Sequence, residues 1–145
     1  PGFRRPLARG GVAAVRVMRL LLDTHIFLWY LAGDAGLRAE IRDLLRDPGN
    51  QVFLSPVSIW EALVKNQLGK LPLPDEPGLY LSRQRVRHGI SSLDLDEASV
   101  RQLVSLPRLH RDPFDRLLIC QALCHDMILV TVDELIWEYP VATIG

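Results

Sequence analysis

Short apolar runs alternate along this chain with stretches of helical period, and this alternation limits the possible folds most. The runs at 20–23, 51–54, 90–93, 128–132 and 141–144 have the length of buried strands. Strands that alternate with helices favour a parallel sheet covered by helices on both faces. With 145 residues, 48% of them hydrophobic, the chain suits one α/β domain rather than two.

Two helix starts are marked by a capping residue that is followed by proline. Ser55-Pro56 and Asp112-Pro113 each supply an N-cap side chain and a proline at the first helical position. The helix after Ser55 has an apolar stripe that we expect to be buried, with Gly69 as its stop: Val57, Trp60, Val64 and Leu68. Other helices are predicted near 24–31, 37–46, 79–86, 96–106 and 134–139.

The first 17 residues differ from the rest in composition. They contain four arginines and no acid, with several glycines and prolines, and show no clear periodicity. We expect residues 1–17 to be a disordered arm or extension and residues 18–145 to form the domain. The whole chain has 17 basic and 17 acidic residues, so without the arm 13 basic residues face 17 acidic ones. Binding of nucleic acid would therefore need a local basic patch.

The remaining composition points to the cytoplasm. No apolar run approaches the roughly 20 residues of a membrane span, and no convincing signal peptide is present. Cys120 and Cys124 are four residues apart on a predicted helix, which favours buried thiols in a reducing compartment over a disulfide. A zinc site is not expected there, because His125 is the only further ligand type nearby.

Four acids lie where the chain leaves a predicted strand or enters a helix: Asp23, Glu61, Asp115 and Asp133. A fifth, Asp112, lies just before the third. In a parallel sheet, strand ends and the following helix starts meet at one edge, where ligands bind. Carboxylates that share a cleft repel one another unless metal binds or protons are taken up. Mg²⁺ and Mn²⁺ suit such oxygen ligands, and metal-assisted phosphodiester hydrolysis uses them.

Each acid also has a purely structural interpretation. Asp23, Asp112 and Asp133 can cap the helices that follow them. Asp115 falls at the third helical position, where the helix dipole favours an acid. Glu61 can pair with Lys65 one turn later. A metal site is therefore indicated by the convergence of several acids and not by any one of them.

The order of these motifs resembles the PIN-domain ribonucleases, in particular the VapC-type toxins of bacterial toxin–antitoxin pairs. The matching segments are LLDTH at 21–25, SPVSIWE at 55–61, HRDPFDR at 110–116 and LVTVD at 129–133. The resemblance implies a PIN-like three-layer α/β/α sandwich with a small, mainly parallel sheet. It also implies a Mg²⁺- or Mn²⁺-dependent endoribonuclease toxin that forms a homodimer and is neutralised by a cognate VapB-like antitoxin.

Carried over to this chain, the resemblance assigns roles to the acids. Asp23 and Asp115 would be the main metal ligands, and Glu61 and Asp133 would complete the cluster directly or through water. Asp112 is a possible additional acid. Further side chains are candidates for contacts with phosphate or water: Thr24, Thr131, Lys65, Lys70, Arg108, His110, Arg111 and Arg116.

The remaining prominent side chains are assigned to packing. His25 is expected to pack or form hydrogen bonds rather than bind metal. Trp29, Tyr30, Leu31 and Trp60 are expected in the core, with some of them available to a dimer surface or an antitoxin groove.

Three other functions were compared with this one. A haloacid-type phosphatase needs a second Asp two residues after the first, whereas Asp23 is followed by Thr24 and His25. A receiver-like module needs an acidic pair at the first strand and a late lysine, but the last lysine is Lys70. A catalytically silent PIN-like module that binds RNA or protein remains the alternative, since only the intact acids distinguish it from an enzyme.

Overall fold

The computed structural model describes residues 17–145, so the predicted arm lies outside the described residues except for Val17. A five-stranded sheet forms the centre, with the strand order β3-β2-β1-β4-β5 and every neighbouring pair parallel. The strands are β1 (Arg19–Leu22), β2 (Gln51–Leu54), β3 (Ser91–Ser92), β4 (Ile128–Val130) and β5 (Thr143–Ile144). The prediction of a parallel α/β sheet is confirmed.

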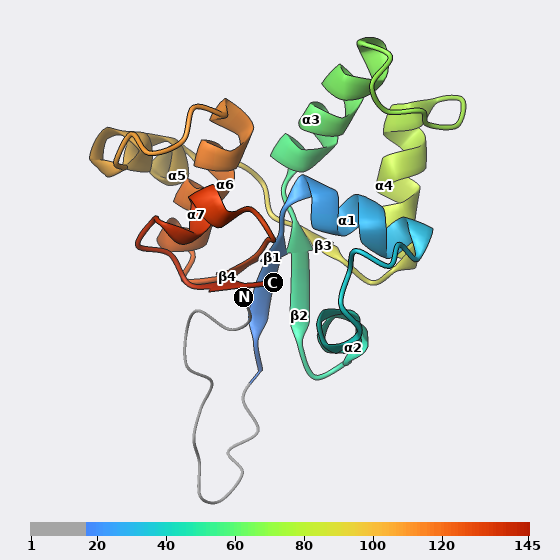
Figure 1. The fold of residues 1–145 in the computed structure, drawn as a ribbon, viewed down its shortest axis with the longest axis horizontal. Coiled ribbons are helices and arrows are strands. Elements are labelled where there is room, and N and C mark those ends of the chain that lie inside the picture. The colour runs from blue at the N-terminus through green and yellow to red at the C-terminus, as the bar shows by residue number, and fades with distance from the viewer. Residues whose placement is uncertain (1–16) are drawn as a thin grey trace, which may run out of the picture.

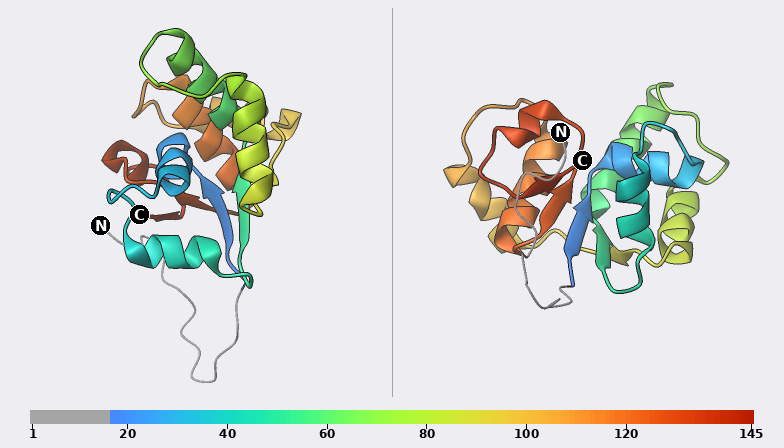
Figure 2. Two further views of the ribbon diagram at one scale, coloured as in Figure 1. Left: turned by 90° about the vertical axis from the view of Figure 1, so that its right-hand side faces the viewer. Right: turned by 60° about the horizontal axis from the view of Figure 1, so that its bottom comes forward.

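Helices cover both faces of this sheet and complete three layers. The α-helices are α1 (Thr24–Ala32), α2 (Ala39–Arg46), α3 (Pro56–Gln67), α4 (Pro77–Arg87), α5 (Glu97–Arg101), α6 (Pro113–Cys124) and α7 (Glu134–Trp137), and the 3₁₀ helix η1 (Gln102–Ser105) follows α5 directly. α1, α2 and α4 lie on one side of the sheet, and α5, α6 and α7 lie on the other (Figure 1 and Figure 2). Among residues 17–145, no helix is long and apolar enough to cross a bilayer.

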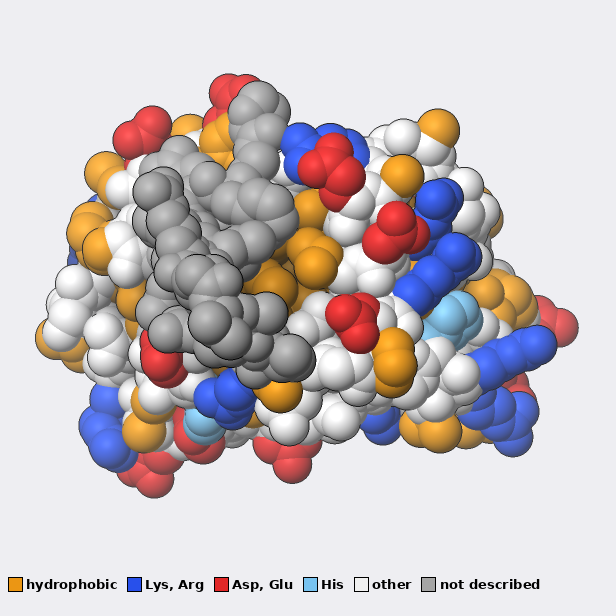
Figure 3. Space-filling view, turned by 90° about the horizontal axis from the view of Figure 1, so that it is seen from below, with side chains coloured by type: hydrophobic (Ala, Val, Ile, Leu, Met, Phe, Trp, Pro, Cys, Tyr) orange, Lys and Arg blue, Asp and Glu red, His pale blue; other side chains and the backbone are white. Residues whose placement is uncertain are grey.

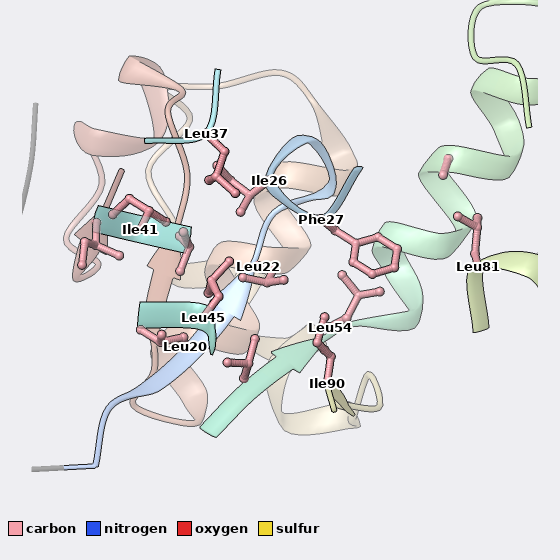
Figure 4. Close-up of a cluster of buried hydrophobic side chains, with 14 residues drawn as sticks. Leu20, Leu22, Ile26, Phe27, Leu37, Ile41, Leu45, Leu54, Leu81 and Ile90 are labelled. Atoms are coloured by element: carbon pink, nitrogen blue, oxygen red, sulfur yellow. The ribbon is translucent and has the colours of Figure 1, made fainter. Parts of the chain in front are cut away.

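The central strand β1 contributes side chains to the hydrophobic clusters on both faces of the sheet. Leu20 and Leu22 pack with Phe27 of α1 and the buried residues of α2 in one cluster (Figure 4). Leu21 faces the opposite side and packs with Leu118 of α6. Alternate side chains of a strand point to opposite faces, so a strand covered on both faces must be apolar throughout. This explains the uninterrupted apolar run in the sequence.

The buried face of α3 differs from the predicted stripe. Val57 is buried, but Trp60 is 55% exposed and Leu68 is 63% exposed. The helix instead buries Val57, Ser58, Glu61 and Ala62, which share one face at helical spacing. The expectation that Trp60 lies in the core is therefore wrong. Glu61 is buried on this face because Thr24 and Lys65 satisfy its carboxylate.

The C-terminal end of α6 also differs from expectation. Cys120 is buried, as predicted, whereas Cys124 at the last position of the helix is exposed. Both thiols are free in this structure. On the face of the molecule seen from below, acidic and basic side chains are interspersed (Figure 3).

Candidate metal centre

The strand order creates a switch point beside β1. From β1 the chain moves to β2 and β3 on one side, and it later returns to β4 and β5 on the other. The crevice outside the carboxyl ends of β1 and β4 is where open α/β sheets bind ligands. The backbone N–H of Asp23, just after β1, donates to the carbonyl of Val130 at the end of β4 at 3.0 Å. The two strand ends are thus joined at this edge.

A pocket of about 380 Å³ opens at this edge, and the four predicted acids all line it. Its lining consists of Asp23, Thr24, His25, Trp29, Glu61, Lys65, His110, Asp112, Asp115, Val132 and Asp133. These residues come from four separate parts of the chain. His25 is exposed at the pocket, and its ring centroid lies 6.1 Å from that of Trp29.

Asp23 combines helix capping with a place in the pocket. Its Oδ1 accepts a hydrogen bond from the backbone N–H of Ile26 at 2.8 Å, which caps α1. The side chain is buried, and this burial raises the pKa of Asp23 despite hydrogen bonds from Thr131 and Ile26. The capping interpretation is therefore correct, but it does not remove the carboxylate from the cluster.

Glu61 is buried and held at both oxygens. Its Oε1 accepts a hydrogen bond from the hydroxyl of Thr24 at 2.5 Å, and its Oε2 lies 2.9 Å from Nζ of Lys65. The predicted pairing with Lys65 is present, although it lies in the pocket rather than on an open surface. A buried carboxylate needs such partners, because its desolvation is otherwise costly.

His110 joins the two remaining acids. Its Nε2 lies 2.8 Å from Oδ2 of Asp115 and 3.2 Å from Oδ2 of Asp133. The donor atoms of these three residues all lie within 4.8 Å of one another. Asp133 also caps α7, because its Oδ1 accepts from the N–H of Leu135 at 2.9 Å. The sequence placed His110 only among the phosphate contacts, although it lies five residues before Asp115 in the same motif.

The environment of Asp115 disfavours its negative charge. Burial raises the pKa of Asp115 to about 7, and the charges of Asp112, Glu61 and Asp23 add to this effect. The charge of His110 acts in the opposite direction. A site with this property favours binding of a proton or a cation.

Asp112 serves mainly as the cap of α6. Its Oδ1 accepts from the backbone N–H groups of Phe114 at 2.8 Å and Asp115 at 3.2 Å. Its side chain also lines the pocket, so both acids of the Asp-x-x-Asp pair reach it. The capping interpretation holds for Asp112, and its role in the cluster stays a prediction.

A buried tyrosine that the sequence did not identify holds the loop before α6. The Tyr139 hydroxyl accepts from the backbone N–H groups of Leu109 at 3.1 Å and His110 at 2.8 Å. Nη1 of Arg116 donates to the same hydroxyl at 3.1 Å and to the carbonyl of Pro107 at 2.8 Å. Tyr139 thereby positions His110, and Arg116 braces the loop. A tyrosine in a C-terminal turn carries no sequence signal for this role.

A second hollow of about 790 Å³ adjoins the acidic pocket and shares His110 with it. Arg108, Arg111 and Arg116 line this hollow, together with Leu103, Val104 and Leu106. It supplies the local basic surface that the overall charge balance cannot supply. Lys70 is exposed and lines neither hollow.

The two predicted threonine contacts are engaged with the protein itself. The hydroxyl of Thr24 donates to Glu61, and the Oγ1 of Thr131 accepts from the N–H of Asp133 at 3.1 Å. Both therefore orient acids of the cluster in this structure. Their contact with water or phosphate stays a prediction.

The amino-acid sequence is similar to those of known proteins. The model of the family described as PIN domain matches residues 20–140. Ribonuclease VapC16 of Mycobacterium tuberculosis is 37% identical over 59 residues, which cover 41% of this chain and 42% of that protein. The match therefore spans less than half of that relative.

Two solved structures share the fold. VapBC2 from Rickettsia felis, bound to a DNA fragment from its promoter, matches with a TM-score of 0.64 and 15% identity, covering 87% of this chain and 97% of that one. VapBC-1 from nontypeable Haemophilus influenzae matches with a TM-score of 0.59 and 19% identity, covering 83% of this chain and 91% of that one. At such identities the likeness concerns the fold alone.

Proposed function

The chain belongs to the PIN domain family, and on that premise we propose that it is a metal-dependent endoribonuclease of the VapC type. It hydrolyses RNA phosphodiester bonds with Mg²⁺ or Mn²⁺ as the cofactor. The observation that carries this proposal is the presence of Asp23, Glu61, Asp115 and Asp133 in one pocket. The likeness to Ribonuclease VapC16 supports the choice of RNA as the substrate.

The donor set fits a hard divalent cation. All four acids offer carboxylate oxygens, which Mg²⁺ and Mn²⁺ prefer. Burial raises the pKa of both Asp23 and Asp115, so a cation beside them would stabilise their charged forms. Asp23 and Asp115 would be the main ligands, with Glu61 and Asp133 completing the site. A bound cation would lower the pKa of the attacking water and offset charge on the phosphate.

The side chains around the acids keep them in place for this chemistry. Lys65 and Thr24 hold the two oxygens of Glu61, so this carboxylate has a fixed orientation. His110 bridges Asp115 and Asp133 from a loop that Tyr139 anchors. A dedicated side-chain base is not required, although a carboxylate of the pocket can accept the proton of the attacking water.

The basic hollow beside the pocket gives the RNA backbone a path. Arg108 and Arg111 are exposed there and can contact phosphates on one side of the scissile bond. Arg116 contributes positive charge while it braces the loop. Lys65 lines the acidic pocket and is a further candidate for contact with phosphate.

The proposal includes partners. The two solved structures of similar fold are named VapBC2 and VapBC-1, which supports a partner of the VapB type. We infer that this chain is a cytoplasmic toxin that forms a homodimer and is neutralised by a cognate VapB-like antitoxin.

The test is cleavage of a total-RNA pool by the purified, antitoxin-free chain with Mg²⁺ or Mn²⁺. Discrete fragments are expected, and they should disappear with EDTA and in Asp23→Asn. Asp75→Asn is the matched control, because it removes an exposed carboxylate that does not line the pocket.

Two outcomes would contradict the proposal. Cleavage that survives in Asp23→Asn would exclude the proposed site. Absence of cleavage by correctly folded protein across the pool would favour a silent module that binds RNA or protein.

A further inference from the structure

Three side chains with three different donor types meet at the C-terminal end of α6. They are Asp96, Cys124 and His125, and one donor atom from each lies within 4.8 Å of the other two. Nε2 of His125 is 2.9 Å from Oδ2 of Asp96. Asp115 and Cys124 are nine residues apart on α6, which corresponds to about 14 Å along the helix axis. This cluster is therefore separate from the acidic pocket.

Hydrogen bonds hold the side chain of Asp96 and the backbone of His125 in place without a ligand. Asp96 caps α5, because its Oδ1 accepts from the N–H of Ser99 at 2.9 Å, so Oδ2 is left to face His125. His125 follows α6 directly, and its carbonyl accepts from Nη1 of Arg19 at 2.7 Å.

Cys124 supplies the third donor atom, the sulfur of its thiol. Its thiol is free and exposed, so rotation of one short side chain can adjust the sulfur position. Ligands of one zinc ion lie roughly 3 to 4 Å from each other, given bond lengths of about 2.0 to 2.3 Å in tetrahedral geometry. Asp96 and His125 are now in hydrogen-bond contact at 2.9 Å, so a small separation of the two side chains would bring them into this range.

The donor types decide which ion fits. Thiolate sulfur and imidazole nitrogen favour zinc and similar borderline ions, whereas Mg²⁺ and Mn²⁺ prefer oxygen alone. The sequence did not predict this site because Asp96 is distant from the cysteines along the chain, and only the packing of α5 against α6 brings it near.

We propose that Asp96, Cys124 and His125 form a second metal site, for Zn²⁺ or a similar divalent transition metal, with a fourth position open to water. A bound ion would connect α5 to the end of α6. The site is independent of the proposed nuclease activity, because it shares no residue with the acidic pocket.

The test is a Co²⁺ titration of the EDTA-treated full chain, followed by ultraviolet and visible absorption. Cobalt bound to a thiolate shows a near-ultraviolet charge-transfer band, which cobalt bound only to oxygen lacks. We expect this band in the unaltered chain and in Asp23→Asn, and we expect Zn²⁺ to displace it. His125→Asn should weaken Co²⁺ binding by at least about 10-fold.

The two cysteines provide a matched pair of variants. Cys124→Ser should abolish the charge-transfer band, whereas Cys120→Ser should keep it. Absence of the band in the folded chain, or its persistence in Cys124→Ser, would overturn the proposal. Circular dichroism checks that each variant is folded, and the result does not depend on whether RNA is cleaved.

Discussion

The two ends of α6 show how burial separates two kinds of polar cluster. At the N-terminal end, Asp115 lies between α3 and the loop of His110, and burial raises its pKa to about 7. At the C-terminal end, hydrogen bonds from Ser99 lower the pKa of Asp96. Asp115, at one end of α6, is therefore disfavoured in its charged form. Asp96, which lies near the other end, is favoured in its charged form.

The difference arises from where each end of α6 lies on the sheet. The N-terminal end reaches the carboxyl edge at the switch point, where acids from three other segments converge, namely Asp23, Glu61 and Asp133. At the C-terminal end, His125 is in contact with Asp96, the cap of α5, and with Arg19 at the start of β1. Convergence of like charges calls for a hard cation at the first end, and mixed donors suit a softer ion at the second.

The largest expected effect separates the two ends by activity. Asp115→Asn should lower RNA cleavage by more than about 100-fold, since it removes a proposed ligand rather than an outer partner. Cys124→Ser, at the other end of the helix, should leave the cleavage rate unchanged. Initial rates with a single RNA substrate in Mg²⁺ measure both. Equal losses in the two variants would show that the ends do not act separately.

A substitution in the middle of α6 should destabilise the whole domain and thereby affect both ends of the helix. Leu118 is fully buried in the middle of α6, and Leu118→Ala should lower the free energy of unfolding by about 2 to 5 kcal/mol. Val104→Ala is the control, because Val104 is 92% exposed. Urea denaturation followed by circular dichroism gives both values. A change below about 0.5 kcal/mol for Leu118→Ala, the range of surface substitutions, would contradict the packing of α6 described above.

The same substitution at His110 and at His125 compares the two ends of α6 directly. His110→Gln should reduce cleavage by about 10- to 100-fold and raise the Mg²⁺ concentration for half-maximal rate, because His110 orients two proposed ligands. His125→Gln should change neither quantity. A Mg²⁺ titration of the cleavage rate distinguishes the two variants. An unchanged Mg²⁺ requirement in His110→Gln would remove His110 from the site.

Asp112 distinguishes capping from catalysis. Asp112→Ala should cost about 1 kcal/mol of stability, because it removes the cap of α6. Asp112→Asn should preserve most of the cap, since Asn is also a preferred N-cap residue. If Asp112 only caps, cleavage by the folded Asn variant stays near that of the unaltered chain. A loss of the size expected for Asp115→Asn would make Asp112 a member of the metal centre.

The smallest expected effects concern how stability changes with pH in the absence of metal, where Asp115 and Asp96 should act in opposite directions. The folded pKa of Asp115 lies near 7, above its ordinary value of 3.8, so the folded state binds more protons. The stability that this proton confers is present below pH 4 and is lost as the pH rises through 7. Asp115→Asn should therefore gain in Tm relative to the unaltered chain between pH 5 and pH 8, in EDTA.

Asp96 provides the contrasting case. Its folded pKa lies below the ordinary value of 3.8, so its contribution is present above that pH and is lost as the pH falls through the folded pKa. Asp96→Asn should lower Tm at neutral pH, and the difference should shrink in acid. Thermal melts of both variants across pH check the signs. The same sign for both would mean that burial does not separate the two ends of α6.

Local sequence determined most of the fold. The alternation of apolar runs and helical stretches predicted all five strands, and Ser55, Asp112 and Pro113 marked helix starts that the structure contains. The strand at 51–54 agrees with β2 in its bounds. These features depend on neighbouring residues in the chain, since backbone preferences and caps act within a few residues.

Tertiary structure decided which side chains meet. The motifs predicted that four acids share an edge, but His110 between Asp115 and Asp133 depends on a loop that Tyr139 anchors. The approach of Asp96 to His125 likewise depends on how α5 packs against α6. Contacts between distant segments follow from strand order and helix packing, and no local period in the sequence records them. For that reason the sequence by itself determined the elements and the acids, and only the fold decided their partners.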